Sequence, residues 1–164
     1  VTVQRPESRG SVTLASADPR QRPRILFNYL ATDRDRRELR DGVRALRAVF
    51  GARAFDRYRG PEISSGAGAK TDAEIDAFAR AEAVTDFHGC STCRMGPESD
   101  PASVVDRAGL VHGTSGLRVA DVSIYPHVIT GNLNASAMMI GEKIADAIRG
   151  TTPLPPEDPA AGRR

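Results

Sequence analysis

The chain has 164 residues, of which 40% are hydrophobic and 27% charged, and its formal net charge is +2 at pH 7. This composition is typical of a soluble globular protein and argues against wholesale disorder. No membrane-spanning helix is expected, because Glu142, Lys143 and Asp146 interrupt the longest nearly apolar stretch well short of the roughly 18 residues that such a helix needs.

The charge is divided unevenly along the chain. Val1–Gly60 carries a net charge of +7, and the remaining residues carry −5. A basic segment can indicate nucleic-acid binding, but the arginines between Arg34 and Arg47 alternate with acidic residues, as on an exposed helix with many ion pairs. Since no zinc-finger spacing or aromatic-rich sheet motif accompanies the charge, we expect no nucleic-acid partner.

Two short strands are expected near the N-terminus. Ser11–Leu14 is rich in β-branched residues, and Arg24–Leu30 places large apolar side chains at alternate positions. Pro19 and Pro23 break the chain between them. The two segments are therefore predicted to pair as an antiparallel sheet.

The first helix is predicted from a cap at Thr32 or Asp33 to about Phe50 or Phe55. Its apolar residues recur at helical spacing and predict one buried stripe. The stripe consists of Leu39, Val43, Leu46 and Phe50. This spacing makes the helix a clear expectation for this half of the chain.

A shorter second helix is predicted after a loop. Ser64–Gly68 has loop composition. Thr71 and Glu74 then match a capping box, in which each side chain can bond the backbone N–H of the other residue. Ile75, Phe78 and Ala79 continue the pattern at helical spacing.

From Asp86 onward we expect short strands and glycine turns, followed by one long helix. The strand candidates are Val104–Val105, Leu110–His112 and Leu117–Ala120. The helix is expected over Asn134–Ile148 and to stop at Gly150. Its predicted core face consists of Met138, Met139, Ile140, Ile144 and Ile148. Four prolines within Thr151–Arg164 predict a disordered tail.

The two cysteines, Cys90 and Cys93, cannot form the disulfide framework of a small secreted domain, so a reducing, cytoplasmic compartment is expected. Their C-x-x-C spacing also occurs in redox pairs and in zinc sites. A zinc site would need His88 and His112 as further ligands, and the strand-to-helix context of a redox pair is missing. We therefore expect no metal, a structural His112, and no role for His127.

Several motifs follow one another between Asp86 and Gly150. They are F-H-G-C-S-T-C-R-M-G from Phe87, V-V-D from Val104, G-L-R-V-A-D-V-S from Gly116 and G-N-L-N-A from Gly131. Their order and spacing closely resemble the C-terminal signature of the glucose-methanol-choline (GMC) oxidoreductases, which are FAD-dependent. Gln4–Leu14 resembles the substrate domain of that family more weakly.

Oxidation of an alcohol by a flavin requires a base for the hydroxyl proton and a donor that stabilises the developing alkoxide. The resemblance places His88 at the family's base and Asn132 at its second catalytic position. Because an asparagine amide donates a hydrogen bond but exchanges no proton near pH 7, His88 would carry the acid–base chemistry alone. The segment Ile129–Asp146 resembles choline-oxidising members, which implies oxidation of choline or another primary alcohol to an aldehyde.

The FAD contacts implied by the resemblance involve three residues. Asp121 and Val122 match the family's contact to the ribityl and phosphate region, and Leu133 matches a backbone contact to the flavin ring. The sequence itself supports the same interpretation, because Asn132 and Leu133 precede a long helix whose amides and dipole favour the negative charge of a reduced flavin. The alternative is that Asn132 serves as a cap for that helix.

Two features depart from a complete member of the family. Ser91 stands where the family usually has glycine, which carries a cost if positive φ is required there. No Gly-x-Gly-x-x-Gly run, which would hold the FAD pyrophosphate, occurs in the sequence. The chain is therefore expected to need an FAD-binding domain, either on the same longer chain or on a separate subunit. A non-catalytic remnant or interaction module is the competing interpretation.

The predicted fold class is α+β. Residues 1–84 would form part of a substrate-binding domain, with an antiparallel sheet and helices. Residues 85–150 would form a catalytic segment that packs on an FAD-binding domain absent from this chain, and residues 151–164 would form the tail.

Overall fold

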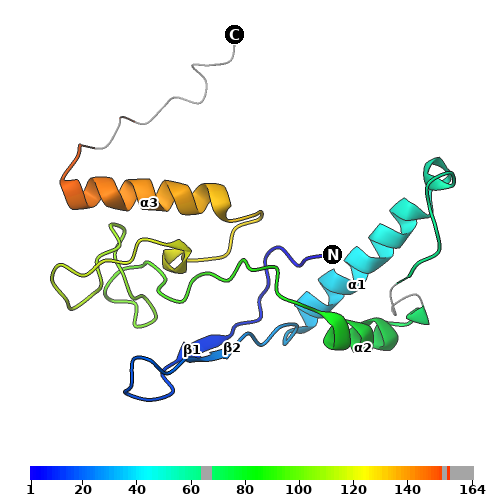
Figure 1. Ribbon diagram of the computed structural model, residues 1–164, viewed down its shortest axis with the longest axis horizontal. Coiled ribbons are helices and arrows are strands. Elements are labelled where there is room, and N and C mark those ends of the chain that lie inside the picture. The colour runs from blue at the N-terminus through cyan, green and yellow to red at the C-terminus, as the bar shows by residue number, and fades with distance from the viewer. Residues whose placement is uncertain (64–67, 153–154, 156–164) are drawn as a thin grey trace, which may run out of the picture. The chain divides into compact units, whose positions relative to one another are not determined.

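The structure, a computed structural model, describes residues 1–63, 68–152 and 155. Its elements in chain order are β1 (Ser11–Thr13), β2 (Arg24–Leu26), α1 (Asp33–Phe50), the 3₁₀ helix η1 (Arg53–Phe55), α2 (Asp72–Glu82), the 3₁₀ helix η3 (Val122–Ile124) and α3 (Asn134–Arg149) (Figure 1). The α+β class is confirmed. Most of the predicted loop at residues 64–68 and of the predicted tail lies outside the described residues.

The chain divides into two compact units. Unit 1 comprises Val1–His88 and Val128–Gly131, and unit 2 comprises Gly89–His127 and Asn132–Arg164. No helix of the described residues has the length and apolar character needed to cross a membrane.

The sheet of unit 1 consists of β1 and β2, which pair antiparallel with Val12 opposite Ile25. The second strand ends at Leu26, earlier than predicted, because Asn28 and Leu30 adopt positive φ angles of 54° and 56° that interrupt an extended backbone. Large apolar side chains on and beside the sheet are more than half exposed to solvent. They are Val12, Leu14, Ile25, Leu26 and Phe27.

Both helices of unit 1 begin with a satisfied cap. Thr32 Oγ1 accepts a hydrogen bond from the Asp35 N–H at the start of α1. Thr71 and Glu74 form the predicted capping box of α2. Each first turn also carries two acidic residues, which the helix dipole favours.

The two helices are joined by charged contacts. Arg40 of α1 donates to Asp76 of α2 at 2.9 Å, and both side chains are largely buried. The predicted burial of the α1 stripe is only partial. The prediction is wrong for the C-terminal half of the stripe, because Leu46 and Phe50 remain almost half exposed among the described residues.

Asp35 is the only residue of α1 that is buried, and it fastens the N-terminal segment to the helix. Its two carboxylate oxygens accept the backbone N–H groups of Glu7 and Ser8, each at 2.8 Å, and also the Ser8 hydroxyl. Burial alone would raise the pKa of Asp35, but these hydrogen bonds outweigh it and lower the pKa below its ordinary value.

Unit 2 is built largely from short loops joined by single bridges. The bridges are Met95↔Val105, Val105↔Val111 and Leu110↔Arg118. The three predicted strands in this region are therefore wrong as strands. Glycines with positive φ at Gly109, Gly113 and Gly116 turn the chain before a ladder can extend.

The core of unit 2 is an apolar cluster beneath α3. It consists of Val105, Ile124, Tyr125, Leu133, Ile140 and Ile144. Ile140 and Ile144 are four residues apart and define the buried face of the helix, as predicted. The expected burial of Met138, Met139 and Ile148 is wrong, since all three are exposed.

Candidate active site

The loop that follows His88 is tied to η3 by three backbone hydrogen bonds within unit 2. They run from Ser91 N–H to the Val122 carbonyl (3.3 Å), from Cys93 N–H to the Ser123 carbonyl (2.9 Å) and from Met95 N–H to the Ile124 carbonyl (2.7 Å). Residues that lie about 30 positions apart in the sequence thus run side by side. The arrangement connects the loop that follows His88 to the segment that carries Asp121 and Val122.

Asp121 caps the short helix η3. Its Oδ1 accepts the Ser123 N–H at 2.7 Å, while the side chain remains exposed. The Oδ2 atom makes no hydrogen bond to any described residue, so this oxygen is available to a ligand. Val122 is half-buried and packs against the apolar core, and its carbonyl accepts N–H groups from both Ser91 and Tyr125.

The start of α3 is open. Leu133 occupies the cap position, and no side chain accepts from the first-turn N–H groups. The first turn contains no acidic residue, and the Ser136 hydroxyl donates to the Leu133 carbonyl rather than capping an amide. Gly131, just ahead, has a φ of 145°.

This geometry tests the interpretation of Asn132 as a helix cap. Its side chain is exposed and makes no hydrogen bond to the described residues, so the interpretation of Asn132 as a cap of α3 is wrong. The amide group is free to act on a ligand. Leu133, in contrast, is buried in the core and offers only its backbone to the open helix end.

His88 is the last residue of the first segment of unit 1. The residue is half-buried, and its ring makes no hydrogen bond within the described part of the chain. Asn132, Leu133, Asp121 and Val122 all belong to unit 2. The structure thus brings the predicted cofactor residues and Asn132 into one unit, whereas His88 is described with the other.

Ser91 has a φ of 69°, in the left-handed region that glycine adopts without cost. The conformational cost expected for serine at this position is therefore present. The Ser91 hydroxyl donates to the Cys90 sulfur at 3.3 Å. Phe87, directly before His88, also has a positive φ, of 58°.

The other two histidines differ in their surroundings. His112 Nε2 lies 3.1 Å from the Gly96 carbonyl oxygen, which is a structural contact. His127 is exposed. Over residues 1–63, 68–152 and 155, no group of three or more His, Cys, Asp or Glu side chains is arranged to hold a metal ion.

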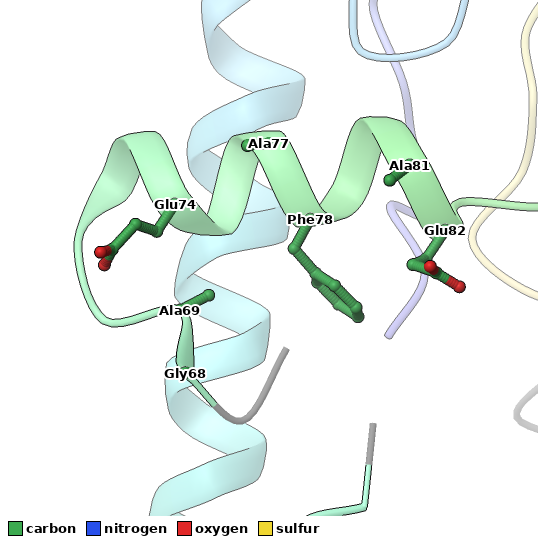
Figure 2. A pocket seen from close by; sticks show the side chains of 7 residues that line it. All are labelled: Gly68, Ala69, Glu74, Ala77, Phe78, Ala81 and Glu82. Atoms are coloured by element: carbon green, nitrogen blue, oxygen red, sulfur yellow. The ribbon is translucent and has the colours of Figure 1, made fainter. Parts of the chain in front are cut away.

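Two surface pockets of about 400 Å³ contain none of the predicted site residues. One lies in unit 2 beside His112 and Glu98. The other lies in unit 1 along α2, where Figure 2 shows Phe78 among the residues that line it. Neither pocket presents the base and the amide that alcohol oxidation needs.

Tyr125 is a residue that the sequence did not single out. It is 7% exposed, and its hydroxyl is buried with no hydrogen-bond partner among the described residues. Nothing in the local pattern Ser123–Pro126 signals this, because the missing partner depends on which distant residues surround the ring.

Comparison with known proteins identifies the family. The family model for the C-terminal part of the GMC oxidoreductases matches residues 6–141. This chain belongs to the GMC oxidoreductase family. The resemblance expected from the motifs is thereby confirmed.

Several family members are close relatives. An oxygen-dependent choline dehydrogenase of Xanthomonas axonopodis pv. citri is 56% identical over 151 residues, which cover 92% of this chain and 27% of that protein. A protein of the same description from Klebsiella pneumoniae is 54% identical, with the same coverage. The chain thus spans about a quarter of the length of these relatives.

Solved structures of the family share the fold. Pyridoxine 4-oxidase from Mesorbium loti is 33% identical with a TM-score of 0.82, and the match covers 90% of this chain and 28% of that one. An FAD-dependent oxidoreductase from Chaetomium thermophilum is 32% identical, also with a TM-score of 0.82, over 90% of this chain and 25% of that one.

Proposed function

We propose that this chain is the catalytic part of an FAD-dependent alcohol oxidoreductase, which oxidises choline or another primary alcohol to the aldehyde once it is combined with an FAD-binding half. The observation that carries the proposal is the open start of α3 directly behind the exposed Asn132 amide. The oxygen-dependent choline dehydrogenases among the relatives support the substrate class.

The residues of unit 2 fit one edge of an FAD molecule. The uncapped N–H groups at the start of α3, beginning at Leu133, would meet the electron-rich N1 and C2 oxygen edge of the flavin. The free Oδ2 of Asp121 and the backbone of Val122 would hold the ribityl region. When bound, FAD supplies the hydride acceptor.

His88 carries the proton transfer, and Asn132 stabilises the oxygen that loses the proton. A His88 ring nitrogen takes the hydroxyl proton of the substrate as the carbonyl forms, and the ring is available because it makes no hydrogen bond to a described residue. The Asn132 NH₂ group donates a hydrogen bond to the same oxygen while it carries alkoxide character. The proton remains on His88 until product leaves.

The test combines this chain with the FAD-binding half, as one polypeptide or as two, and measures choline-dependent bleaching of the flavin absorbance without oxygen. His88→Ala should slow bleaching by about 10²–10⁴-fold. Asn132→Ala should slow bleaching by about 10²–10³-fold.

His127→Ala is the matched control, because His127 is an exposed histidine without an assigned role. Its rate should equal that of the wild type. Bleaching at the wild-type rate in His88→Ala would refute the assignment of the base. A wild-type protein that binds FAD but is bleached by no primary alcohol would instead be a non-catalytic module.

A further inference from the structure

Tyr125 has an unexplained polar atom in the core of unit 2. Its side-chain neighbours in the buried cluster are aliphatic, and they are Val105, Ile124, Leu133, Ile140 and Ile144. No other buried side-chain nitrogen or oxygen in the described residues lacks a partner. Because a buried hydroxyl without an acceptor destabilises the folded state, a phenylalanine would suit this chain better if nothing else bound there.

The position of Tyr125 links the two segments that the proposed function assigns to FAD. Its backbone N–H donates to the Val122 carbonyl at 3.2 Å, directly at the end of η3. Its ring shares the buried cluster with Leu133, the residue at the open start of α3. The orphan hydroxyl and the uncapped helix end therefore belong to one packed group within one unit.

Resting on the proposed function, we propose that Tyr125 is a positioning residue of the flavin site. Its hydroxyl donates to an acceptor oxygen that arrives only when the FAD-bearing half assembles with unit 2. The new bond would fix the Tyr125 ring, which follows η3 and shares the buried cluster with Leu133 at the start of α3.

An acceptor oxygen can come from FAD or from the polypeptide of the FAD-binding half. The experiment distinguishes these sources with Tyr125→Phe in the full-length enzyme, in the FAD-free and FAD-loaded forms. The measurements are the melting temperature of each form, the dissociation constant of FAD and the visible absorbance of the bound flavin. Tyr58→Phe is the control, because Tyr58 is 80% exposed and lies in unit 1.

If FAD supplies the oxygen, Tyr125→Phe weakens FAD binding by about tenfold and leaves the melting temperature of the FAD-free form unchanged or higher. If the polypeptide supplies it, both forms melt at a lower temperature. Tyr58→Phe changes none of these values. Unchanged FAD affinity, with equal or higher melting temperatures in both forms, would overturn the proposal.

The two proposals fail in different ways. A wild-type enzyme that binds no FAD contradicts both. An enzyme whose flavin is bleached normally after His88→Ala contradicts the catalytic assignment only, and the effects of Tyr125→Phe on FAD affinity and on the two melting temperatures still decide the role of Tyr125.

Discussion

Unit 1 and unit 2 are stabilised in different ways, and the contrast is clearest at their helix starts. In unit 1, Thr32 and Thr71 cap α1 and α2, and acidic residues occupy both first turns. In unit 2, α3 begins at Leu133 with neither device. The helix starts of unit 1, at which no catalytic or cofactor residue is proposed, carry both devices, whereas the helix start proposed for the flavin edge carries neither.

The interiors of the two units also differ. Unit 1 buries Ala69, Ile75 and Ala79 but is also held by polar contacts, in which Asp35 binds the N-terminal segment and Arg40 pairs with Asp76. The core of unit 2 is an apolar cluster, and backbone hydrogen bonds join the loops around it. We therefore expect unit 1 to respond to pH and unit 2 to respond to changes in volume.

The largest effect is expected for Gly109→Ala in unit 2. Gly109 has a φ of 75°, and an added Cβ would lie 2.5 Å from the Val119 carbonyl oxygen and 2.9 Å from Ile144 Cδ1. Strain and overpacking together should reduce the free energy of unfolding by about 2–5 kcal/mol. Gly113→Ala is the control, because it has a similar φ with open space around it and should cost only about 1 kcal/mol. Urea unfolding followed by circular dichroism measures both, and equal losses would contradict the close packing under α3.

Asp35→Asn should destabilise unit 1 by about 2 kcal/mol, because one carboxylate oxygen becomes an NH₂ group facing donors. The lowered pKa of Asp35 means that its stabilising contribution is present above the unfolded-state pKa near 3.9 and is lost as pH falls through the folded-state value. The difference between wild type and Asp35→Asn should therefore shrink in acid. Unfolding curves at neutral and acidic pH test this, with exposed Asp41→Asn as a control that changes little. A difference independent of pH would rule out the carboxylate as its source.

Ser91→Gly should stabilise unit 2 by about 1 kcal/mol relative to Ser91→Ala. Both variants remove the hydroxyl that contacts Cys90, but only glycine relieves the positive φ. Thermal unfolding of the two variants compares them directly. Equal stabilities would show that residue 91 is not held in the left-handed conformation.

The smallest effect is expected for Asn134→Asp, at the first position of α3. A carboxylate there meets the uncapped amides and should stabilise the helix by about 0.5 kcal/mol. The same charge competes with an anionic flavin edge, so FAD titration of the assembled enzyme should show weaker binding. A variant that is more stable and also binds FAD more tightly would contradict the role given to the open helix end.

The elements with local signals were predictable from the sequence. The capping box at Thr71 and Glu74 starts α2, and Gly150, with a φ of 69°, ends α3 within one residue of the expected position. Family membership was equally readable, because motifs are local strings. Neither of these predictions needs knowledge of distant contacts.

Features that depend on distant contacts were not predictable. The exposure of Leu46 depends on what covers α1, and the orphan hydroxyl of Tyr125 depends on neighbours from Val105 to Ile144. The three strands predicted in unit 2 were wrong, because a β-branched pair such as Val104–Val105 predicts extended backbone but not a partner strand long enough to form a ladder.

The uncovered β1–β2 sheet affects how the chain behaves at high concentration. The outer edges of its strands pair with no other strand of the described residues, and Val12, Ile25 and Leu26 are more than half exposed. Such a sheet is a template for edge-to-edge association between copies. The soluble fraction of the isolated chain should consequently fall as its concentration rises. Production together with a partner protein that covers the sheet should protect the chain from aggregation and proteolysis.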